Sequence, residues 1–160
     1  MALRIIIIED DPIMGVGMEH LLKSQGYDVS LATDGRGGLE MVLNTEPDMV
    51  ITDLRLPTLN GFEVLKGIKE ANIRSGVIVI TAYAEVKDAV RAIRMGAFDY
   101  IAKPFSNDEL LIAIEKYLNF NRLETELSQL KDSLREKSEF ENIIGVSQSI
   151  KNVFAFISSV

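Results

Sequence analysis

The sequence of 160 residues contains no cysteine, and this absence excludes several kinds of chemistry at once. Without cysteine the chain forms no disulfide, holds no metal through thiolates and has no thiol nucleophile. A cysteine-free chain also agrees with a reducing compartment. We therefore expect a cytoplasmic protein whose chemistry depends on other side chains.

Long apolar runs are missing as well. The longest run, Ile5–Ile8, is far too short to cross a bilayer. No basic segment followed by a long apolar stretch opens the chain, so we expect neither a signal peptide nor a membrane partner.

Basic side chains are in the minority, with 17 Lys and Arg against 24 Asp and Glu and a formal net charge of −7. A surface that binds duplex DNA needs clustered Lys and Arg, so these residues are not expected to contact DNA. The acidity is uneven, because residues 1–120 hold 18 acidic and 12 basic side chains and residues 121–160 hold 6 and 5. Part of the acidity of the first region is therefore a candidate for a binding site.

Short apolar runs alternate with helical patterns over residues 1–120. In these runs apolar and polar residues do not strictly alternate, and such continuous apolar runs are typical of strands covered on both faces. The repeat of strand and helix predicts a three-layer α/β domain with a parallel sheet. The expected strands are Leu3–Ile8, Val29–Ala32, Met49–Thr52, Val77–Thr81 and Tyr100–Ala102, and the intervening helices are marked by Met14, Met18, Leu21 and Leu22, by Leu39, Val42 and Leu43, by Val64, Leu65 and Ile68, by Val86, Ala89, Val90 and Ile93, and by Leu110, Leu111, Ile114 and Leu118.

Two helix starts are marked by capping residues. Asp11-Pro12 places an acceptor side chain before a proline at the first helical position. Ser106 followed by Glu109 has the spacing of a capping box. Both signals support the helix boundaries expected from the apolar spacing.

A heptad pattern begins near residue 120. Its apolar positions are spaced three and four residues apart, as in the seam of a coiled coil, and they are Phe120, Leu123, Leu127, Leu130 and Leu134. Glu126 and Lys131 lie five residues apart at positions that attract each other across a parallel dimer. We expect residues 121–139 to continue the fifth helix as a dimerisation linker. The alternative is one amphipathic helix that packs on its own domain.

A further apolar pattern occupies residues 140–160 and is interrupted by the end of the sequence. We interpret it as the first part of another domain.

Polar and charged residues follow four of the expected strands. In a parallel sheet the carboxyl ends of the strands meet at one edge, where ligands bind. Carboxylates from neighbouring strands repel each other or recruit a cation, and hard oxygen ligands suit Mg²⁺. With a lysine and a hydroxyl nearby, the set predicts phosphoryl transfer onto an aspartate. The residues are Glu9, Asp10, Asp11, Asp53, Thr81 and Lys103.

Each of these residues also has an ordinary interpretation. Asp11 reads as a helix cap, Asp53 as a turn residue, Thr81 as the polar end of a strand and Lys103 as a surface charge. Their joint placement at successive strand ends favours a functional site.

Five separated motifs resemble, in order and spacing, the receiver domain of two-component response regulators over residues 3–118. No essential position departs from the family pattern. The resemblance implies the flavodoxin-like, CheY-like (βα)5 doubly wound sheet with strand order 2-1-3-4-5. The motifs are Ile7-Ile8-Glu9-Asp10-Asp11-Pro12, Ile51-Thr52-Asp53-Leu54-Arg55-Leu56-Pro57 with Asn60-Gly61, Ile80-Thr81-Ala82, Gly96-Ala97-Phe98-Asp99-Tyr100 and Lys103-Pro104-Phe105.

The resemblance implies a role for each residue of the site. Asp53 accepts a phosphoryl group from the phosphohistidine of a histidine kinase. Mg²⁺ is held by Asp10, by Asp53, by the backbone carbonyl of Arg55 and, through water, by Glu9. Thr81 and Lys103 bind phosphoryl oxygens, Tyr100 changes rotamer on activation, and the Lys103–Pro104 peptide bond is cis.

The residues after the heptads are similar to the entry into the AAA+ domain of sigma-54-dependent activators of the NtrC kind, in the stretch Phe140-Glu-Asn-Ile-Ile-Gly-Val-Ser. This resemblance implies that a full-length protein contacts sigma-54 RNA polymerase and DNA through other domains. A receiver that controls a different output domain is the alternative.

Three other functions are weighed against this one. A dinucleotide-binding fold needs G-x-G-x-x-G, but Gly15 and Gly17 are followed by His20 at the third place. An aspartyl-phosphate phosphatase usually has a second acid two residues after the nucleophile, where this sequence has Arg55. His20 as a phosphorelay histidine lacks a four-helix setting, so a surface histidine is the better interpretation.

Two residues are expected to tune the lifetime of the phosphoryl group. Arg55 and Tyr83 lie two positions after Asp53 and Thr81 and are both bulky. Side chains of this size restrict the in-line approach of water, so slow loss of phosphate is expected. The protein is accordingly expected to be a switch and not a turnover enzyme.

Overall fold

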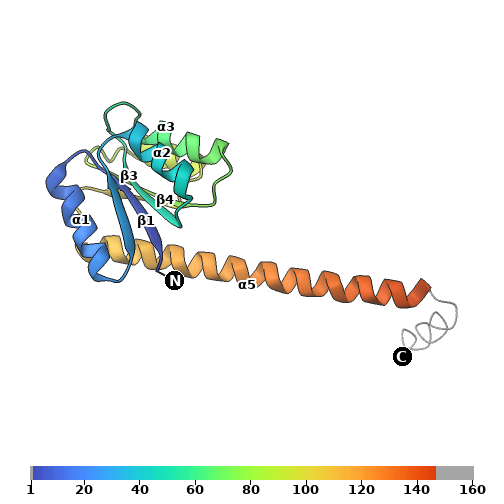
Figure 1. The fold of residues 1–160 in the computed structure, drawn as a ribbon. Coiled ribbons are helices and arrows are strands. Elements are labelled where there is room, and N and C mark those ends of the chain that lie inside the picture. The colour runs from blue at the N-terminus through green and yellow to red at the C-terminus, as the bar shows by residue number, and fades with distance from the viewer. Residues whose placement is uncertain (1, 147–160) are drawn as a thin grey trace. The chain divides into compact units, whose positions relative to one another are not determined.

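The fold was obtained as a computed structural model that describes residues 2–146, and the surroundings of side chains up to residue 142. Strands and helices alternate along this part of the chain (Figure 1). Their bounds are β1 Arg4–Ile8, α1 Pro12–Ser24, β2 Asp28–Ala32, α2 Gly35–Thr45, β3 Met49–Asp53, α3 Gly61–Glu70, β4 Gly76–Thr81, α4 Val86–Arg94, β5 Asp99–Ala102 and α5 Asn107–Val146. The expected strands are confirmed to within one residue at each end.

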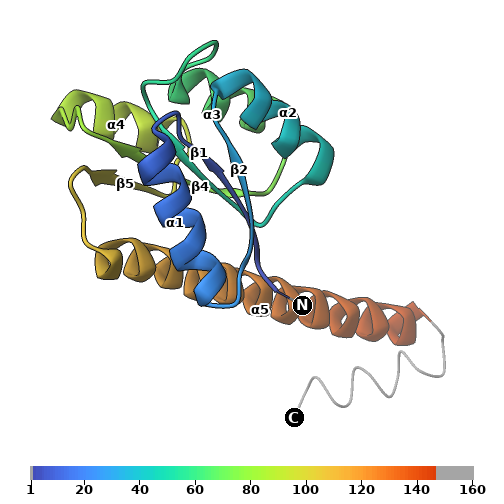
Figure 2. The ribbon, with the colours of Figure 1, turned by 60° about the vertical axis from the view of Figure 1, so that its left-hand side comes forward.

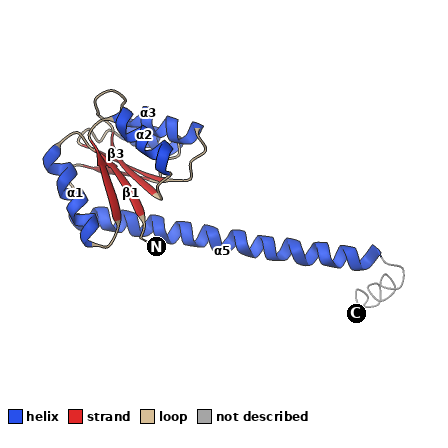
Figure 3. Cartoon of the chain, viewed as in Figure 1, coloured by secondary structure: helices blue, strands red, loops and turns tan. Residues whose placement is uncertain are grey.

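The strands form one sheet, drawn in red in Figure 3. All neighbouring strands are parallel, and their order is β2-β1-β3-β4-β5. All residues of β3 and β4 are buried, as the continuous apolar runs predict. The register pairs Ile8 of β1 with Thr52 of β3, and Asp53 of β3 with Ile80 of β4. The ends of these three strands therefore lie at the same edge of the sheet.

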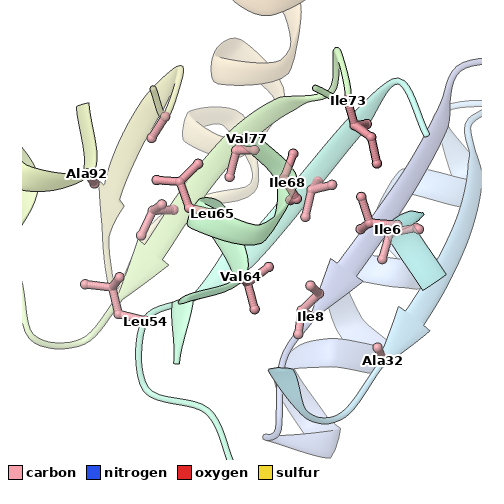
Figure 4. Close-up of a cluster of buried hydrophobic side chains, with 14 residues drawn as sticks. Ile6, Ile8, Ala32, Leu54, Val64, Leu65, Ile68, Ile73, Val77 and Ala92 are labelled. Carbon is pink, nitrogen blue, oxygen red and sulfur yellow. The ribbon is translucent and has the colours of Figure 1, made fainter. Parts of the chain in front are cut away.

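Helices cover both faces of the sheet. Figure 2 shows α2, α3 and α4 on one side and α1 with the beginning of α5 on the other. On the first side, Ile6, Ile8 and Val77 of the sheet pack with Leu65 and Ile68 of α3 in one apolar cluster (Figure 4). On the second side the buried helix residues are Gly15, Met18 and Leu22 of α1 and Leu110, Ala113, Ile114 and Tyr117 of α5. The three-layer α/β architecture is confirmed.

Side-chain caps begin most of the helices. The Asp11 carboxylate accepts hydrogen bonds from the amides of Ile13 and Met14, at 2.9 and 3.4 Å, as the Asp11-Pro12 signal predicts. Ser106 and Glu109 exchange reciprocal hydrogen bonds of 3.1 and 3.2 Å at the start of α5. These caps satisfy amide groups that have no partner inside the helix.

Helix α4 is held less firmly than the others. Ala92 is its one buried residue, and its N-cap residue Glu85 makes no capping hydrogen bond through its side chain. The apolar residues whose spacing identifies the helix, Val86, Val90 and Ile93, are exposed. An apolar face of α4 thus lies on the surface.

Helix α5 extends to Val146, and the chain divides into two units after Tyr117. In the second unit the heptad residues Phe120, Leu123, Leu127, Leu130 and Leu134 are between 48% and 59% exposed. The predicted continuation of the fifth helix is confirmed. Of the further domain expected at residues 140–160, residues 147–160 lie outside the described part of the chain. Between residues 2 and 146, none of the helices has the length and apolar character needed to cross a membrane.

Candidate phosphoryl-acceptor site

The predicted site residues gather at the carboxyl edge of the sheet. Glu9 and Asp10 follow β1, Asp53 is the last residue of β3, and Lys103 follows β5. Carboxylate oxygens of Glu9, Asp10 and Asp53 lie within 4.8 Å of one another. The expected convergence of acids from two neighbouring strands is therefore present in the fold.

Burial distinguishes the three acids. Glu9 and Asp53 are buried, whereas Asp10 is exposed. The Glu9 carboxylate accepts a hydrogen bond of 3.1 Å from the amide of Asp11, and that of Asp53 accepts one of 3.2 Å from the amide of Arg55. These bonds fix two carboxylates and leave the third open to solvent.

Lys103 bridges the two buried acids. Its Nζ donates to Oδ2 of Asp53 at 2.6 Å and to Oε2 of Glu9 at 2.8 Å. The lysine side chain is only 14% exposed, so solvent screens these contacts weakly. The Lys103–Pro104 peptide bond is cis, as expected.

Burial and pairing oppose each other in the titration of this cluster. Burial raises the pKa of Glu9, and the nearby charge of Asp53 adds to this effect, while the bonds from Lys103 and the Asp11 amide offset only part of it. For Lys103, burial alone would lower the pKa. The bonds to Asp53 and Glu9 outweigh it, and the pKa of Lys103 is raised.

This donor set fits a hard divalent cation. All three clustered groups offer carboxylate oxygens, one of them from an exposed side chain with room for water ligands. Mg²⁺ prefers a small number of carboxylates together with water. Lys103 lies at hydrogen-bond distance from Asp53 as well as from Glu9, so a cationic side chain that can bind phosphoryl oxygens is already at the site.

Thr81 and Tyr100 meet at the backbone of Tyr83. The hydroxyl of Thr81, which is fully buried, accepts a hydrogen bond of 3.2 Å from the Tyr83 amide. The Tyr100 hydroxyl donates to the Tyr83 carbonyl at 3.2 Å. Burial raises the pKa of Tyr100, and the charges of Asp88 and Glu85 add to it, so the phenol is a hydrogen-bond donor at neutral pH.

Arg55 and Tyr83 are in direct contact. The guanidinium carbon of Arg55 lies 3.5 Å from the centre of the Tyr83 ring, at the distance of a cation–π interaction. These two residues have matching positions and similar bulk in the sequence, and the fold brings them together.

One feature of the site has no signal in the sequence. Tyr83 links Thr81, Tyr100 and Arg55 through its amide, its carbonyl and its ring. Backbone groups carry no residue-type information, so only the fold identifies this link.

Comparison with known proteins agrees with this geometry. Residues 5–115 match the family described as the response regulator receiver domain. The chain belongs to this family and contains the receiver domain of a two-component response regulator.

Curated relatives extend the comparison. Regulatory protein AtoC of Escherichia coli is 33% identical over 150 residues, which cover 94% of this chain and 32% of AtoC. Transcriptional regulatory protein DltR of Streptococcus agalactiae is 40% identical over 70% of this chain and 50% of its own length. Transcriptional regulatory protein ZraR of E. coli is 39% identical over 71% of this chain and 26% of its own. The chain thus spans about a quarter to a half of these relatives.

Solved structures share the fold. A response regulator receiver domain from Clostridium thermocellum has a TM-score of 0.71 and 31% identity, over 76% of this chain and 98% of its own. A CheY-like receiver domain from Methanospirillum hungatei has a TM-score of 0.74 and 28% identity, over 78% and 99%. These likenesses confirm the CheY-like fold expected from the sequence.

Proposed function

We propose that this protein is a phosphorylation-dependent switch in which Asp53 accepts a phosphoryl group from the phosphohistidine of a histidine kinase. The observation that carries the proposal is the arrangement around Asp53, with Lys103 at 2.6 Å and two further acids within 4.8 Å. A carboxylate oxygen attacks phosphorus, the P–N bond breaks, and the imidazole nitrogen keeps the electron pair and takes a proton.

Mg²⁺ would be held by Asp10, by Asp53, by the backbone carbonyl of Arg55 and, through water, by Glu9. When bound, it would neutralise charge on the phosphoryl oxygens. Lys103 sits at hydrogen-bond distance from the acceptor and would bind a phosphoryl oxygen once Asp53 is modified. Thr81, which ends the neighbouring strand, would donate a hydrogen bond from its hydroxyl to a second phosphoryl oxygen.

Phosphorylation would shift the chain between two packings. The Thr81 hydroxyl and the Tyr100 hydroxyl both bond the backbone of Tyr83, so a pull on Thr81 would disturb the bond that keeps Tyr100 in its present position. Tyr100 would then move inward, and the face formed by α4, β5 and α5 would change. The weakly held α4, with its exposed apolar residues, is suited to respond.

The output would pass to a homodimer formed by residues 121–139. The exposed leucines of the heptad pattern support this seam. A sigma-54-type AAA+ ATPase is the proposed output domain of the full-length protein, and it would reach sigma-54 RNA polymerase and DNA through other domains in the cytoplasm. Alignment with AtoC over 150 residues, beyond the receiver match, supports this class of output.

The heptad seam suggests that control is repressive. Unphosphorylated receivers, joined as a dimer, would keep the ATPase domains from assembling into a ring. Deletion of residues 1–120 from the full-length protein should then give constitutive assembly and ATPase activity. An inactive, unassembled deletion protein would contradict the repressive version.

The central test is labelling with a small phosphodonor and Mg²⁺. The wild-type chain should retain about one phosphoryl group that alkali or hydroxylamine removes, as expected of an acyl phosphate, because one acceptor is available. Asp53→Asn should not be labelled, while Asp132→Asn, a change on the exposed surface of α5, should be labelled normally. Labelling of Asp53→Asn would refute the acceptor assignment, and release of many phosphates per chain would indicate a phosphatase.

A further inference from the structure

Thr58, in the loop between β3 and α3, has an unusual backbone conformation. Its φ angle is 69°, in the left-handed region. Among described residues other than glycine, Glu46 and Asn72 share a positive φ, but each lies at the C-terminal end of a helix. A β-branched side chain is strained in this region, so other contacts must hold Thr58 there.

Those contacts come from the start of α2. The Thr58 hydroxyl accepts a hydrogen bond of 2.9 Å from the Arg36 amide and donates one of 3.1 Å to Oδ1 of Asp34. The same Asp34 oxygen accepts a bond of 2.7 Å from the Gly37 amide, which caps α2. One carboxylate therefore begins the helix and holds the loop.

The backbones of the two segments are also in contact. The Gly35 amide donates to the Pro57 carbonyl at 3.0 Å. A Cβ atom at Gly35 would lie 1.8 Å from the Leu59 carbonyl oxygen, so the approach requires glycine. At the far end of the loop, the Gly61 amide donates to the Leu54 carbonyl at 2.8 Å. The loop is thus fixed at both ends.

This loop carries a group that the phosphoryl-acceptor site needs. Arg55 lies within it, donates its amide to the Asp53 carboxylate at 3.2 Å, and supplies the backbone carbonyl assigned above to Mg²⁺. We propose that Thr58 is a positioning residue that, together with Asp34, holds the β3–α3 loop so that the Arg55 carbonyl faces the metal site. The inference rests on the proposed function, because it refines that site.

An ordinary turn would not need this residue. Glycine adopts a positive φ without strain, so a loop that only reverses direction is best served by glycine. Threonine is strained here, yet its hydroxyl makes two hydrogen bonds to α2 that glycine does not make. The strain is compatible with function if the position of the loop matters.

Three variants separate positioning from stability. Thr58→Ala removes the hydroxyl and keeps the strain, Thr58→Gly removes both, and Thr58→Ser keeps the hydroxyl. Thr45→Ala is the matched control, because Thr45 lies at the opposite end of α2 and its hydroxyl bonds only the Met41 carbonyl of the same helix.

The first measurement is amide hydrogen exchange of Gly35 and Arg36 in metal-free protein. Both amides donate to the loop, so exchange should accelerate about tenfold in Thr58→Ala and Thr58→Gly, as expected when one hydrogen bond is lost. Thr58→Ser and Thr45→Ala should leave it near the wild-type rate. Unchanged exchange in Thr58→Ala would show that the Thr58 hydroxyl does not hold the loop against the start of α2, and the proposal would be wrong.

The second measurement is the dissociation constant of Mg²⁺, followed by titration calorimetry. It should rise about tenfold in Thr58→Ala and Thr58→Gly, as when groups that orient metal ligands are removed, and stay near wild type in Thr58→Ser and Thr45→Ala. Thr58→Gly is decisive, because relief of strain should keep its melting temperature close to that of the wild type while Mg²⁺ binding weakens.

The outcomes are distinguishable from failure of the site itself. Normal Mg²⁺ binding by Thr58→Ala and Thr58→Gly, alongside normal binding by the wild type, would overturn the positioning role alone. A wild-type chain that binds no Mg²⁺ would overturn the metal site and this inference with it.

Discussion

The guanidinium of Arg55 stacks on the ring of Tyr83, 3.5 Å from its centre. Arg55 follows Asp53, the proposed phosphoryl acceptor, by two residues, and Tyr83 follows Thr81 by two. The contact therefore joins the loops that leave two adjacent strands of the site. A pair in this position is suited to restrict the approach of water to the modified aspartate.

Loss of this pair should shorten the lifetime of the phosphoryl group. A cation–π contact at an exposed site contributes about 0.5–1 kcal/mol, which corresponds to about a two- to fivefold change in rate. We expect Arg55→Ala combined with Tyr83→Ala to accelerate dephosphorylation by at least this factor, measured by the decay of label at Asp53. Tyr83→Phe keeps the ring and should retain slow decay. Wild-type decay in the double variant would exclude the pair as a barrier to water.

Lys103 should compete with Mg²⁺ in the unmodified protein. Its Nζ occupies oxygens of both Glu9 and Asp53, so Lys103→Met should leave two buried carboxylates for the cation. Hydrogen bonds to charged groups are worth about 1.5–3 kcal/mol, so Mg²⁺ should bind at least about tenfold more tightly to Lys103→Met, and phosphorylation should nevertheless slow. Calorimetry and labelling rates measure the two effects. Weaker Mg²⁺ binding would show that the lysine supports the metal site.

Stability should depend on pH through Asp34. The amide of Gly37 and the hydroxyl of Thr58 hold the pKa of Asp34 below its usual value of 3.8. A carboxyl with a depressed folded-state pKa stabilises the fold above its unfolded pKa and loses this contribution as pH falls through the folded value. Between pH 5 and the onset of acid unfolding, the free energy of unfolding should therefore fall less in Asp34→Asn than in the wild type. Denaturant titration at each pH measures both values. Asp132→Asn is the control, and equal acid sensitivity of all three proteins would contradict the assignment.

Two glycines should respond oppositely to alanine. Gly17 lies within α1, and a Cβ added there would meet no other segment within 4 Å. Gly17→Ala should therefore raise the free energy of unfolding by about 1 kcal/mol. At Gly61 a Cβ would lie 2.4 Å from the Asp53 carbonyl oxygen, and Gly61→Ala should lower it by about 1–3 kcal/mol. Urea titration gives both values. Equal effects at the two positions would show that the close approach at Gly61 is unimportant.

The heptad seam should respond to charge at Glu126 and Lys131. In a parallel dimer Glu126 of one chain faces Lys131 of the other. Glu126→Lys and Lys131→Glu should each weaken the dimer about fivefold, because an attractive contact becomes repulsive twice per dimer, and the double exchange should restore it. Sedimentation equilibrium measures the dissociation constant. If the double exchange does not restore the dissociation constant, the parallel seam is wrong. If the wild-type chain is a monomer, the dimer itself is wrong.

Local sequence signals predicted much of the fold. The apolar runs at Ile5–Ile8 and Val77–Thr81 were sufficient to identify central strands, because residues covered on both faces leave an unbroken pattern. Caps at Asp11 and Ser106 marked helix starts, since they depend on residues two or three positions apart. The heptad spacing likewise predicted the continuation of α5.

Other features depended on contacts between distant segments. The apolar spacing of α4 identified a helix but not its exposed face, because burial is decided by what packs against the helix. The strain of Thr58 and its bond to Asp34 join residues 24 positions apart. The order of strands and the candidate site followed from motifs, but the contacts of Tyr83 through its amide and carbonyl followed only from the fold.

The sequence by itself determined the α/β class, the continuation of the last helix and the set of acids, hydroxyl and lysine at the strand ends. Periodicity and capping are local, and the carboxyl ends of parallel strands share one edge of the sheet. The tertiary structure alone decided that Lys103 bridges Glu9 and Asp53, that Arg55 stacks on Tyr83, and that Thr58 is held by α2. These contacts form when the chain brings distant segments to within hydrogen-bond distance, and no local pattern encodes which of the available partners a side chain then meets.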